Sequence, residues 1–132
     1  PHHLRPLMET AEIQPMVNQL EIHPGYGQFE TVKFCQENGM VVSAYSPLGN
    51  CEILNHEVLV KMAGKYGKSV PHICYRWVLQ HDIMPLTRSH DPERIASNAD
   101  IFDFELSDAD MAKIDALPFI GGAANDPDTV II

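Results

Sequence analysis

The chain has 132 residues, of which 45% are hydrophobic and 20% are charged, so it is long enough for one globular domain with its own core. Its formal net charge of −9 argues against general binding to nucleic acid or to anionic membranes. No apolar run approaches the ~20 residues that span a bilayer, and the first residues lack the apolar stretch of a secretory signal. Cys35, Cys51 and Cys74 show no C-x-x-C spacing, which favours reduced thiols in a cytoplasmic protein.

The first half of the chain alternates helix and strand. Apolar residues three and four positions apart predict a helix over Leu4–Glu12. A strand is predicted at Met16–His23, followed by a Pro-Gly turn. A second helix over Phe29–Asn38 and a second strand over Met40–Ser46 follow.

The middle of the chain is predicted to hold two successive helices and a third strand. The first of these helices covers Glu57–Tyr66, and the second covers Val70–Gln80 with Ser69 as its N-cap. The short strand is predicted at Ile83–Thr87, although a proline is unusual inside a central strand.

Two more helices and a tail complete the chain. Asp91 is placed to cap a helix that has Pro92 in its first turn. Ser107 and Asp110 have the spacing of a capping box at the start of the last helix. Residues 118–132 are rich in Gly, Pro, Asn and Asp, and we expect them to form an ordered or partly ordered C-terminal tail.

Strands that alternate with helices predict an α/β fold with a parallel sheet. Such sheets are normally covered on both faces or closed into a barrel. Three strands make a small sheet, and polar residues such as Gln19 and Glu21 fall within the alternation of the first strand. The pattern therefore indicates part of a larger architecture.

The residues that end the second strand are candidates for ligand binding, because the carboxyl ends of parallel strands carry the sites of such folds. Tyr45 can stack on a flat ring, while Ser46 and the Gly49 turn can offer donors to phosphate oxygens. The alternative is an ordinary turn with a packed tyrosine. Gln19 can pair with a ligand carboxamide or, equally, satisfy neighbouring backbone.

A cation near the start of a helix is the second unusual feature. Arg94 stands at the third position of the helix that Asp91 caps, where the helix dipole disfavours a positive charge by up to ~1 kcal/mol. A bound anion would remove that cost, and Arg88 and Ser89 would reach the same place. The alternative is that Arg94 extends into solvent or pairs with Glu93 or Asp91.

The seven histidines do not predict a metal site. They show neither H-x-x-x-H nor H-E-x-x-H spacing, and His2 and His3 are expected to point apart on the first helix. The absence of G-x-S-x-G also argues against a serine hydrolase.

Taken together, several motifs resemble the C-terminal half of an aldo-keto reductase. They are "VNQLEIHP", "AYSPLG", "GKSVPHICYRWVLQ", "PERIASN" and "IFDFELSDADMAKIDAL". The resemblance covers about Leu4 to Leu117 in the order of the family. It implies a partial (β/α)8 TIM barrel in which residues 1–132 supply strands 6–8 with helices 5–8. It also implies the reduction of aldehydes and ketones with NADPH.

The resemblance implies one set of cofactor-binding residues, for NADP(H). They are Gln19, Tyr45, Ser46, Leu48, Gly49, Arg88, Ser89, Arg94 and Asn98. Gln19 would bind the nicotinamide carboxamide and Tyr45 would stack on the nicotinamide, with the turn after Tyr45 on the pyrophosphate. Arg94 would hold the 2′-phosphate and Asn98 would contact the adenine.

The sequence departs from the family pattern in three respects. Arg88 stands where the family usually has Lys, with one extra residue after Pro85, and Ser97 stands where a Glu is usual. The family's catalytic Asp, Tyr, Lys and His have no match here, so no catalytic residue is assigned. None of the four tyrosines of this chain has the sequence context of the family's catalytic tyrosine; they are Tyr26, Tyr45, Tyr66 and Tyr75.

Two hypotheses of different class follow. In the first, the chain is a fragment of an NADPH-dependent reductase of small carbonyl compounds, and it is inactive alone. In the second, it is a non-catalytic half-barrel that binds a dinucleotide or a protein partner. A structural or regulatory partner protein is a third class. Because a lone three-stranded sheet has two open edges, we also expect self-association of such a half-barrel.

Overall fold

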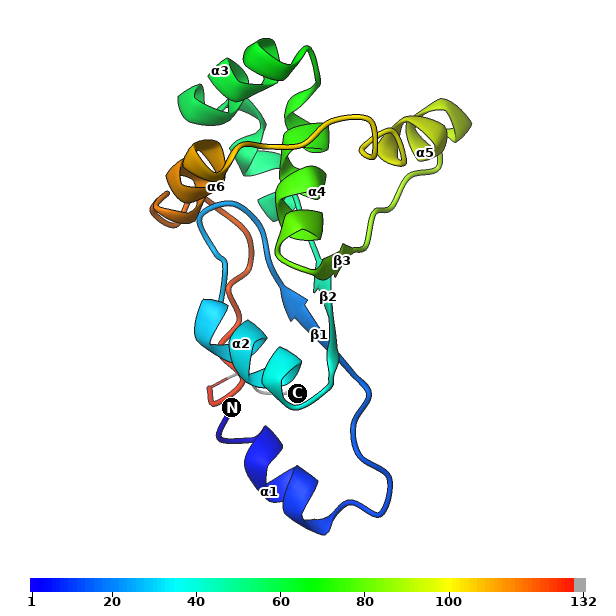
Figure 1. The fold of residues 1–132 in the computed structure, drawn as a ribbon, viewed down its shortest axis with the longest axis vertical. Coiled ribbons are helices and arrows are strands. Elements are labelled where there is room, and N and C mark those ends of the chain that lie inside the picture. The colour runs from blue at the N-terminus through cyan, green and yellow to red at the C-terminus, as the bar shows by residue number, and fades with distance from the viewer. Residues whose placement is uncertain (130–132) are drawn as a thin grey trace.

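The computed structural model describes residues 1–129; the last three residues of the predicted tail lie outside them. Helices and strands alternate along the first part of the chain, and successive helices lie on either side of the last strand (Figure 1). The elements are α1 (Leu4–Thr10), β1 (Val17–Glu21), α2 (Phe29–Glu37), β2 (Val41–Tyr45), the 3₁₀ helix η1 (Gly49–Asn55), α3 (Glu57–Tyr66), α4 (Val70–Gln80), β3 (Ile83–Pro85), α5 (Pro92–Asn98) and α6 (Asp108–Asp115).

The strands form one parallel sheet in the order β1-β2-β3, as the alternation of helix and strand predicts. In its register Glu21 lies opposite Tyr45, and Ala44 lies opposite Pro85. The predicted third strand is too long, because the ladder stops at Pro85. Only Leu86 continues it, donating its N–H to the carbonyl of Ala44 at 2.9 Å.

One face of the sheet packs against helices to form the core. Val42, Ala44 and Ile83 point to this face and are fully or almost fully buried. Helix α4 contributes Trp77, whose indole is buried while its Nε1 donates to Asp115 Oδ1 at 2.8 Å. This contact ties α4 to α6, so the core includes the last helix of the chain.

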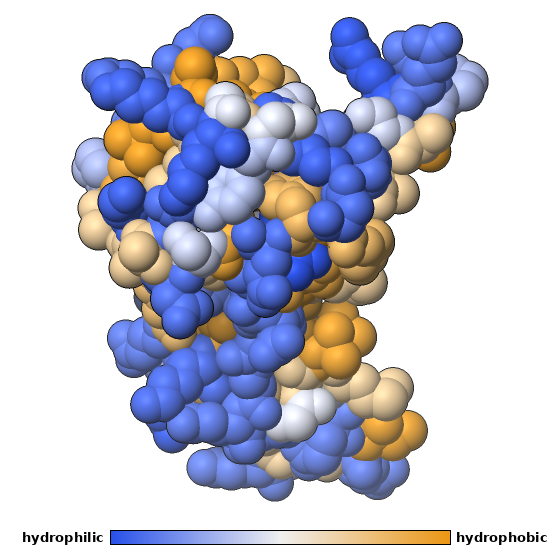
Figure 2. All heavy atoms as spheres, turned by 45° about the horizontal axis from the view of Figure 1, so that its top comes forward, coloured by the Kyte–Doolittle hydropathy of each residue, from blue (hydrophilic) through white to orange (hydrophobic). Residues whose placement is uncertain are grey.

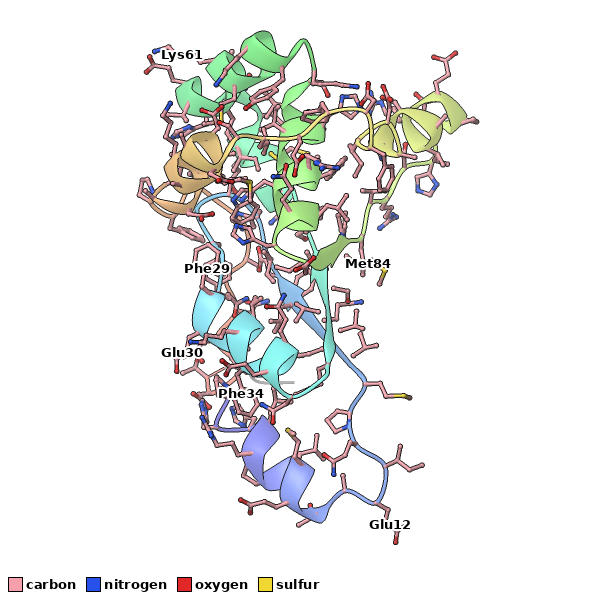
Figure 3. All side chains as sticks on the ribbon, viewed as in Figure 1. Glu12, Phe29, Glu30, Phe34, Lys61 and Met84 are labelled. Carbon is pink, nitrogen blue, oxygen red and sulfur yellow. The ribbon has the colours of Figure 1, made fainter. Side chains whose placement is uncertain are left out.

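The opposite face of the sheet is open at the start of its strands. Val17, Val41 and Met84 occupy this face, and each is about half exposed. Figure 3 shows Met84 pointing away from α4, and hydrophobic patches interrupt the otherwise hydrophilic surface in Figure 2. Exposed apolar side chains in a row on a parallel sheet are unusual, since such sheets are normally covered on both faces.

The predicted N-caps of α4 and α6 are both present, but the predicted capping box of α6 is not. Ser69 accepts from the N–H of His72, and the His72 side chain accepts from the N–H of Ser69 in return, so α4 has a capping box. Ser107 likewise caps α6 by accepting from the N–H of Asp110. The expected capping box there is wrong, because the Asp110 carboxylate is instead bonded to side chains of α3.

Candidate functional site

The turn after β2 has an unusual backbone. Ser46, Asn50 and Cys51 have φ values of 46°, 57° and 70°, in the left-handed region that non-glycine residues seldom occupy. Gly49 adopts φ 50° between them and closes the turn by donating its N–H to the carbonyl of Ser46 at 2.8 Å. Strained backbone of this kind gathers at functional sites.

The 3₁₀ helix η1 that follows is a feature the sequence analysis missed. It contains two residues in the left-handed conformation, Asn50 and Cys51. The Gly49-Asn50 pair was the available signal, because Gly and Asn are the residues that most readily enter that conformation.

Two adjoining cavities form a groove at the carboxyl end of the sheet. The first, of about 380 Å³, is lined by Tyr45 and Ser46. The second, of about 430 Å³, is lined by Arg94 and Asn98. Four residues line both cavities, namely Leu48, Cys51, Tyr75 and Arg88. Each cavity has a volume in the range of small-molecule sites.

The groove brings together seven of the nine predicted cofactor residues, which lie far apart in the sequence. They are Tyr45, Ser46, Leu48, Arg88, Ser89, Arg94 and Asn98. Gly49 is buried in the turn and lines neither cavity. A larger hollow of about 530 Å³ beside β3 is lined mainly by apolar residues, so volume alone does not distinguish the candidate site.

Gln19 is the second predicted residue that does not line the groove. It is exposed on β1, opposite Ser43 in the register of the sheet. Glu21 is the register partner of Tyr45, and Gln19 lies two positions before Glu21 on the same strand. Gln19 and Tyr45 therefore share one face of the sheet. The two side chains therefore belong to one face without lining a common cavity in the described chain.

The two arginines form a cationic end of the groove. Arg94 is 79% exposed, and its Nε lies 3.6 Å from Asp91 Oδ2, which is one of the alternatives open at the level of sequence. The Nη2 atom of Arg88 lies 3.5 Å from the Nε2 atom of His90. Arg88, Ser89 and Arg94 also line a further hollow of about 480 Å³. Both guanidinium groups are thus directed to one exposed region of a chain with a net charge of −9.

The surroundings of two tyrosines in the groove raise the pKa of their hydroxyl groups. Burial raises the pKa of Tyr45, and the negative charge of Glu21 raises it further. Burial raises the pKa of Tyr75 to about 12, with a smaller contribution from Cys74 and Cys51. A phenol with its ordinary pKa of about 10 is already neutral at pH 7, so these shifts extend to higher pH the range in which both side chains can donate a hydrogen bond. Sequence analysis did not select Tyr75 for this groove, since its place on α4 gives no signal without the packing.

The expected arrangement of His2 and His3 on the first helix is wrong. His2 and His3 do not point apart, because both Nε2 atoms contact Asp128 Oδ1, at 2.9 and 2.6 Å. They precede α1, where His3 is the N-cap residue. These three exposed side chains have the donor types of a metal site. No spacing in the sequence could indicate this cluster, since Asp128 lies more than 120 residues after His2.

The cysteines are free in the described chain, as the sequence predicts. Cys35 and Cys74 are buried and Cys51 is exposed. Burial raises the pKa of the Cys74 thiol far above its usual value, so this side chain is a packing element and not a nucleophile. Within residues 1–129, no helix is long and apolar enough to cross a membrane.

Comparisons with known proteins point to one family. The model of the family described as "Aldo/keto reductase family" matches residues 1–118. The uncharacterized oxidoreductase YtbE of Bacillus subtilis is 46% identical over 96% of the chain and 45% of its own length. Glyoxal reductase of the same organism is 49% identical over 88% of the chain and 42% of its own length.

Solved structures agree in fold. MGS-M4, an aldo-keto reductase from a Medee basin deep-sea metagenome library, matches with a TM-score of 0.93 and 36% identity, over 100% of the chain and 50% of its own. A mutant of Gox0644 in complex with NADPH matches with a TM-score of 0.91 and 30% identity, over 99% of the chain and 49% of its own. The chain thus spans about half the length of the relatives it matches.

Proposed function

The chain belongs to the aldo/keto reductase family, and on that premise we propose that it forms part of an NADPH-dependent reductase of small carbonyl compounds. In this proposal residues 1–132 are the C-terminal portion of a (β/α)8 barrel. They supply strands 6–8 with helices 5–8, and residues 118–132 form its tail. Free thiols favour a reducing compartment, and we place the enzyme in the cytoplasm.

The observation that carries the proposal is the groove at the end of the sheet. Its inner end holds an aromatic ring and a hydroxyl, from Tyr45 and Ser46. Its outer end holds Arg94 and Asn98, and Arg88 lines both parts. An extended ligand with a flat ring at one end and phosphate groups toward the other would meet suitable chemistry along the whole groove.

The assigned roles follow the order of these residues along the groove. Tyr45 stacks on the nicotinamide, while Ser46 and Leu48 contact the pyrophosphate, and Gly49 shapes the turn that presents them by donating its N–H to the carbonyl of Ser46. Asn98 contacts the adenine. A bound NADPH supplies the hydride, and the residues of this chain hold and orient it. Gln19, on the same sheet face as Tyr45, is assigned to the nicotinamide carboxamide.

The cationic end of the groove favours NADPH over NADH. NADPH differs by a 2′-phosphate, which an arginine can hold with two parallel hydrogen bonds. We assign this phosphate to Arg94, with Arg88 and Ser89 beside it. Arg94 Nε lies 3.6 Å from Asp91 Oδ2. An exposed pair of this kind is weak, so it can be exchanged for a phosphate at small cost.

The remainder of the barrel is assigned to chain outside these residues. The open sheet face that carries Val17, Val41 and Met84 supports this assignment, and so does the coverage of about half of each relative. The acid–base residues of the family, an Asp, a Tyr, a Lys and a His, have no match here. We therefore expect the 132-residue chain to oxidise NADPH with an aldehyde no faster than buffer does. A rate above buffer would contradict the assignment of the acid–base residues to chain outside these residues.

Cofactor titration tests the groove directly. NADPH and NADH are titrated against the chain by fluorescence, with the wild type, Arg94→Ala and the control Arg5→Ala. Arg5 lies over the ring of Phe34, remote from the groove. Arg94→Ala should weaken NADPH binding about tenfold, since a hydrogen bond to a charged group contributes about 1.5–3 kcal/mol. NADH binding and the control should not change. Equal affinity of the wild type for the two cofactors would count against a 2′-phosphate site.

A further inference from the structure

A buried carboxylate on the sheet holds the C-terminal tail. Glu21 ends β1 and is only 2% exposed. Its Oε1 accepts the N–H of Ala123 at 2.8 Å, and its Oε2 accepts the N–H of Ala124 at 2.8 Å. Two successive backbone amides thus bind both oxygens of one carboxylate. Such charge-assisted hydrogen bonds are roughly twice as strong as neutral ones.

A buried histidine completes the contact. His23 is fully buried, and its Nδ1 donates to the carbonyl of Pro24 at 3.0 Å. Its Nε2 lies 3.5 Å from Glu21 Oε1 and has no hydrogen-bond partner within residues 1–129. A buried polar atom without a partner is costly, so its position facing the carboxylate requires a structural or functional reason.

The tail passes this pair at a glycine that no other residue can replace without a shift. Gly122 has φ 100°, a conformation that side chains rarely adopt. A Cβ at this position would overlap the Glu21 carboxylate and lie 2.6 Å from His23 Nε2. The tail backbone therefore lies directly against the Glu21–His23 pair, and the absence of a side chain permits the approach.

The histidine of this pair also contacts the turn of the candidate site. A Cβ at Gly49 would lie 3.3 Å from the imidazole ring of His23 and 3.5 Å from the carbonyl carbon of Gly121. Gly49 is the glycine that closes the turn after β2. His23 thus packs against both the tail and this turn. Glu21 is in addition the register partner of Tyr45, and its charge raises the pKa of that tyrosine.

We infer that Glu21 and His23 are positioning residues that clamp the tail at Gly121–Ala124 onto the Ser46–Gly49 turn. The clamp makes the tail and the turn one unit, so that loosening the tail changes the backbone that faces the ligand. The effect on the cofactor rests on the proposed function. The clamp itself stands on the hydrogen bonds and the close packing within this chain.

Hydrogen exchange measured on the full chain tests the clamp. Glu21→Gln keeps the size of the side chain but turns an NH₂ group toward one of the two amides. Exchange at Ala123 and Ala124 should then rise on the order of tenfold or more, since two charge-assisted bonds are weakened. Gly122→Ala should give the same result from the side of the tail, because the added Cβ would displace the tail backbone from Glu21.

Two matched variants serve as controls. Glu37→Gln removes the same charge at an exposed position, where Glu37 only faces Lys33 at 3.8 Å. Gly64→Ala adds the same methyl group on α3, where a Cβ would meet no described atom within 4 Å apart from the adjoining backbone of its own helix. Both should leave exchange of the tail amides at the wild-type rate. Unchanged protection of these amides in Glu21→Gln and in Gly122→Ala would overturn the clamp.

A second measurement tests the coupling to the turn. NADPH affinity of both clamp variants should fall about three- to tenfold, with Arg94 untouched. Faster tail exchange with unchanged NADPH affinity would overturn the coupling and leave the clamp as a purely local contact. If the wild type binds no NADPH, the proposed function fails, while the exchange experiment still decides whether the clamp exists.

Discussion

The buried carboxylate of Asp110 connects α3 to α6, and its replacement should measurably destabilise the fold. Asp110 is 2% exposed. Its Oδ2 accepts from the hydroxyl of Tyr66 at 2.6 Å and from Lys65 Nζ at 2.5 Å. The Tyr66 oxygen in turn accepts the N–H of Ser107 at 3.0 Å. Removing the carboxylate therefore disturbs a chain of hydrogen bonds that begins at the N-cap of α6.

The size of the effect follows from these contacts. A hydrogen bond to a charged group contributes about 1.5–3 kcal/mol, and a buried partner left unsatisfied adds to the loss. Lys65 is 57% exposed, so water replaces its contact and it is left out of the sum. We expect Asp110→Ala to lower the free energy of unfolding at pH 7 by about 2–3 kcal/mol.

The pH dependence provides an internal check. The hydrogen bonds from Lys65 and Tyr66 hold the pKa of Asp110 well below its usual range. A lowered pKa in the folded state stabilises the protein above the ordinary pKa of about 4, and this stabilisation is lost as the pH falls below it. The difference between wild type and variant should therefore shrink by about 1 kcal/mol between pH 7 and pH 3.

Urea denaturation of the wild type, Asp110→Ala and Asp108→Asn measures both quantities. Asp108 is exposed in the first turn of the same helix, so its replacement should cost less than about 1 kcal/mol. Two results would refute the reasoning: an Asp110→Ala loss no larger than that of the control, or a difference that does not change between the two pH values.

Other expectations concern the groove, a helix cap and the open sheet face. Tyr45→Ala should weaken NADPH binding about two- to tenfold while Tyr45→Phe should not, because stacking needs the ring; equal losses in an NADPH titration would contradict this. Ser69→Ala should lower the free energy of unfolding by about 1 kcal/mol in urea denaturation, because it removes the cap of α4. The 132-residue chain should self-associate with rising concentration in analytical ultracentrifugation. Met84→Lys should reduce that association, and a monomer at all concentrations would argue against an apolar open face.

Much of the fold could be read from local signals. The spacing of apolar residues, together with the capping residues, predicts each α-helix and strand within a few residues, because both periods reflect which face is buried, but it does not predict the 3₁₀ helix η1. Ser69 and Asp91 cap the helices they precede, since a side-chain oxygen satisfies a free N–H over a distance of two or three residues. Signals of this range lie entirely within the sequence.

The candidate site was predicted unevenly. Seven of the nine residues line one groove, but their assignment came from a resemblance over several motifs and not from any single spacing. Gln19 shows the limit: its strand and face were predictable, yet it lines neither cavity. Whether two side chains share a cavity depends on backbone and chain that lie elsewhere.

By itself the sequence determined the order of the elements, the parallel sheet and the excess of negative charge, because each follows from local composition and period. Only the tertiary structure decided the contacts between distant segments. Glu21 reads as one polar residue in a strand, but folding places it against the amides of Ala123 and Ala124. Asp110 reads as half of a capping box, but folding gives it to Tyr66. A buried polar group must find a partner, and that partner can lie a hundred residues away, where no local pattern can indicate it.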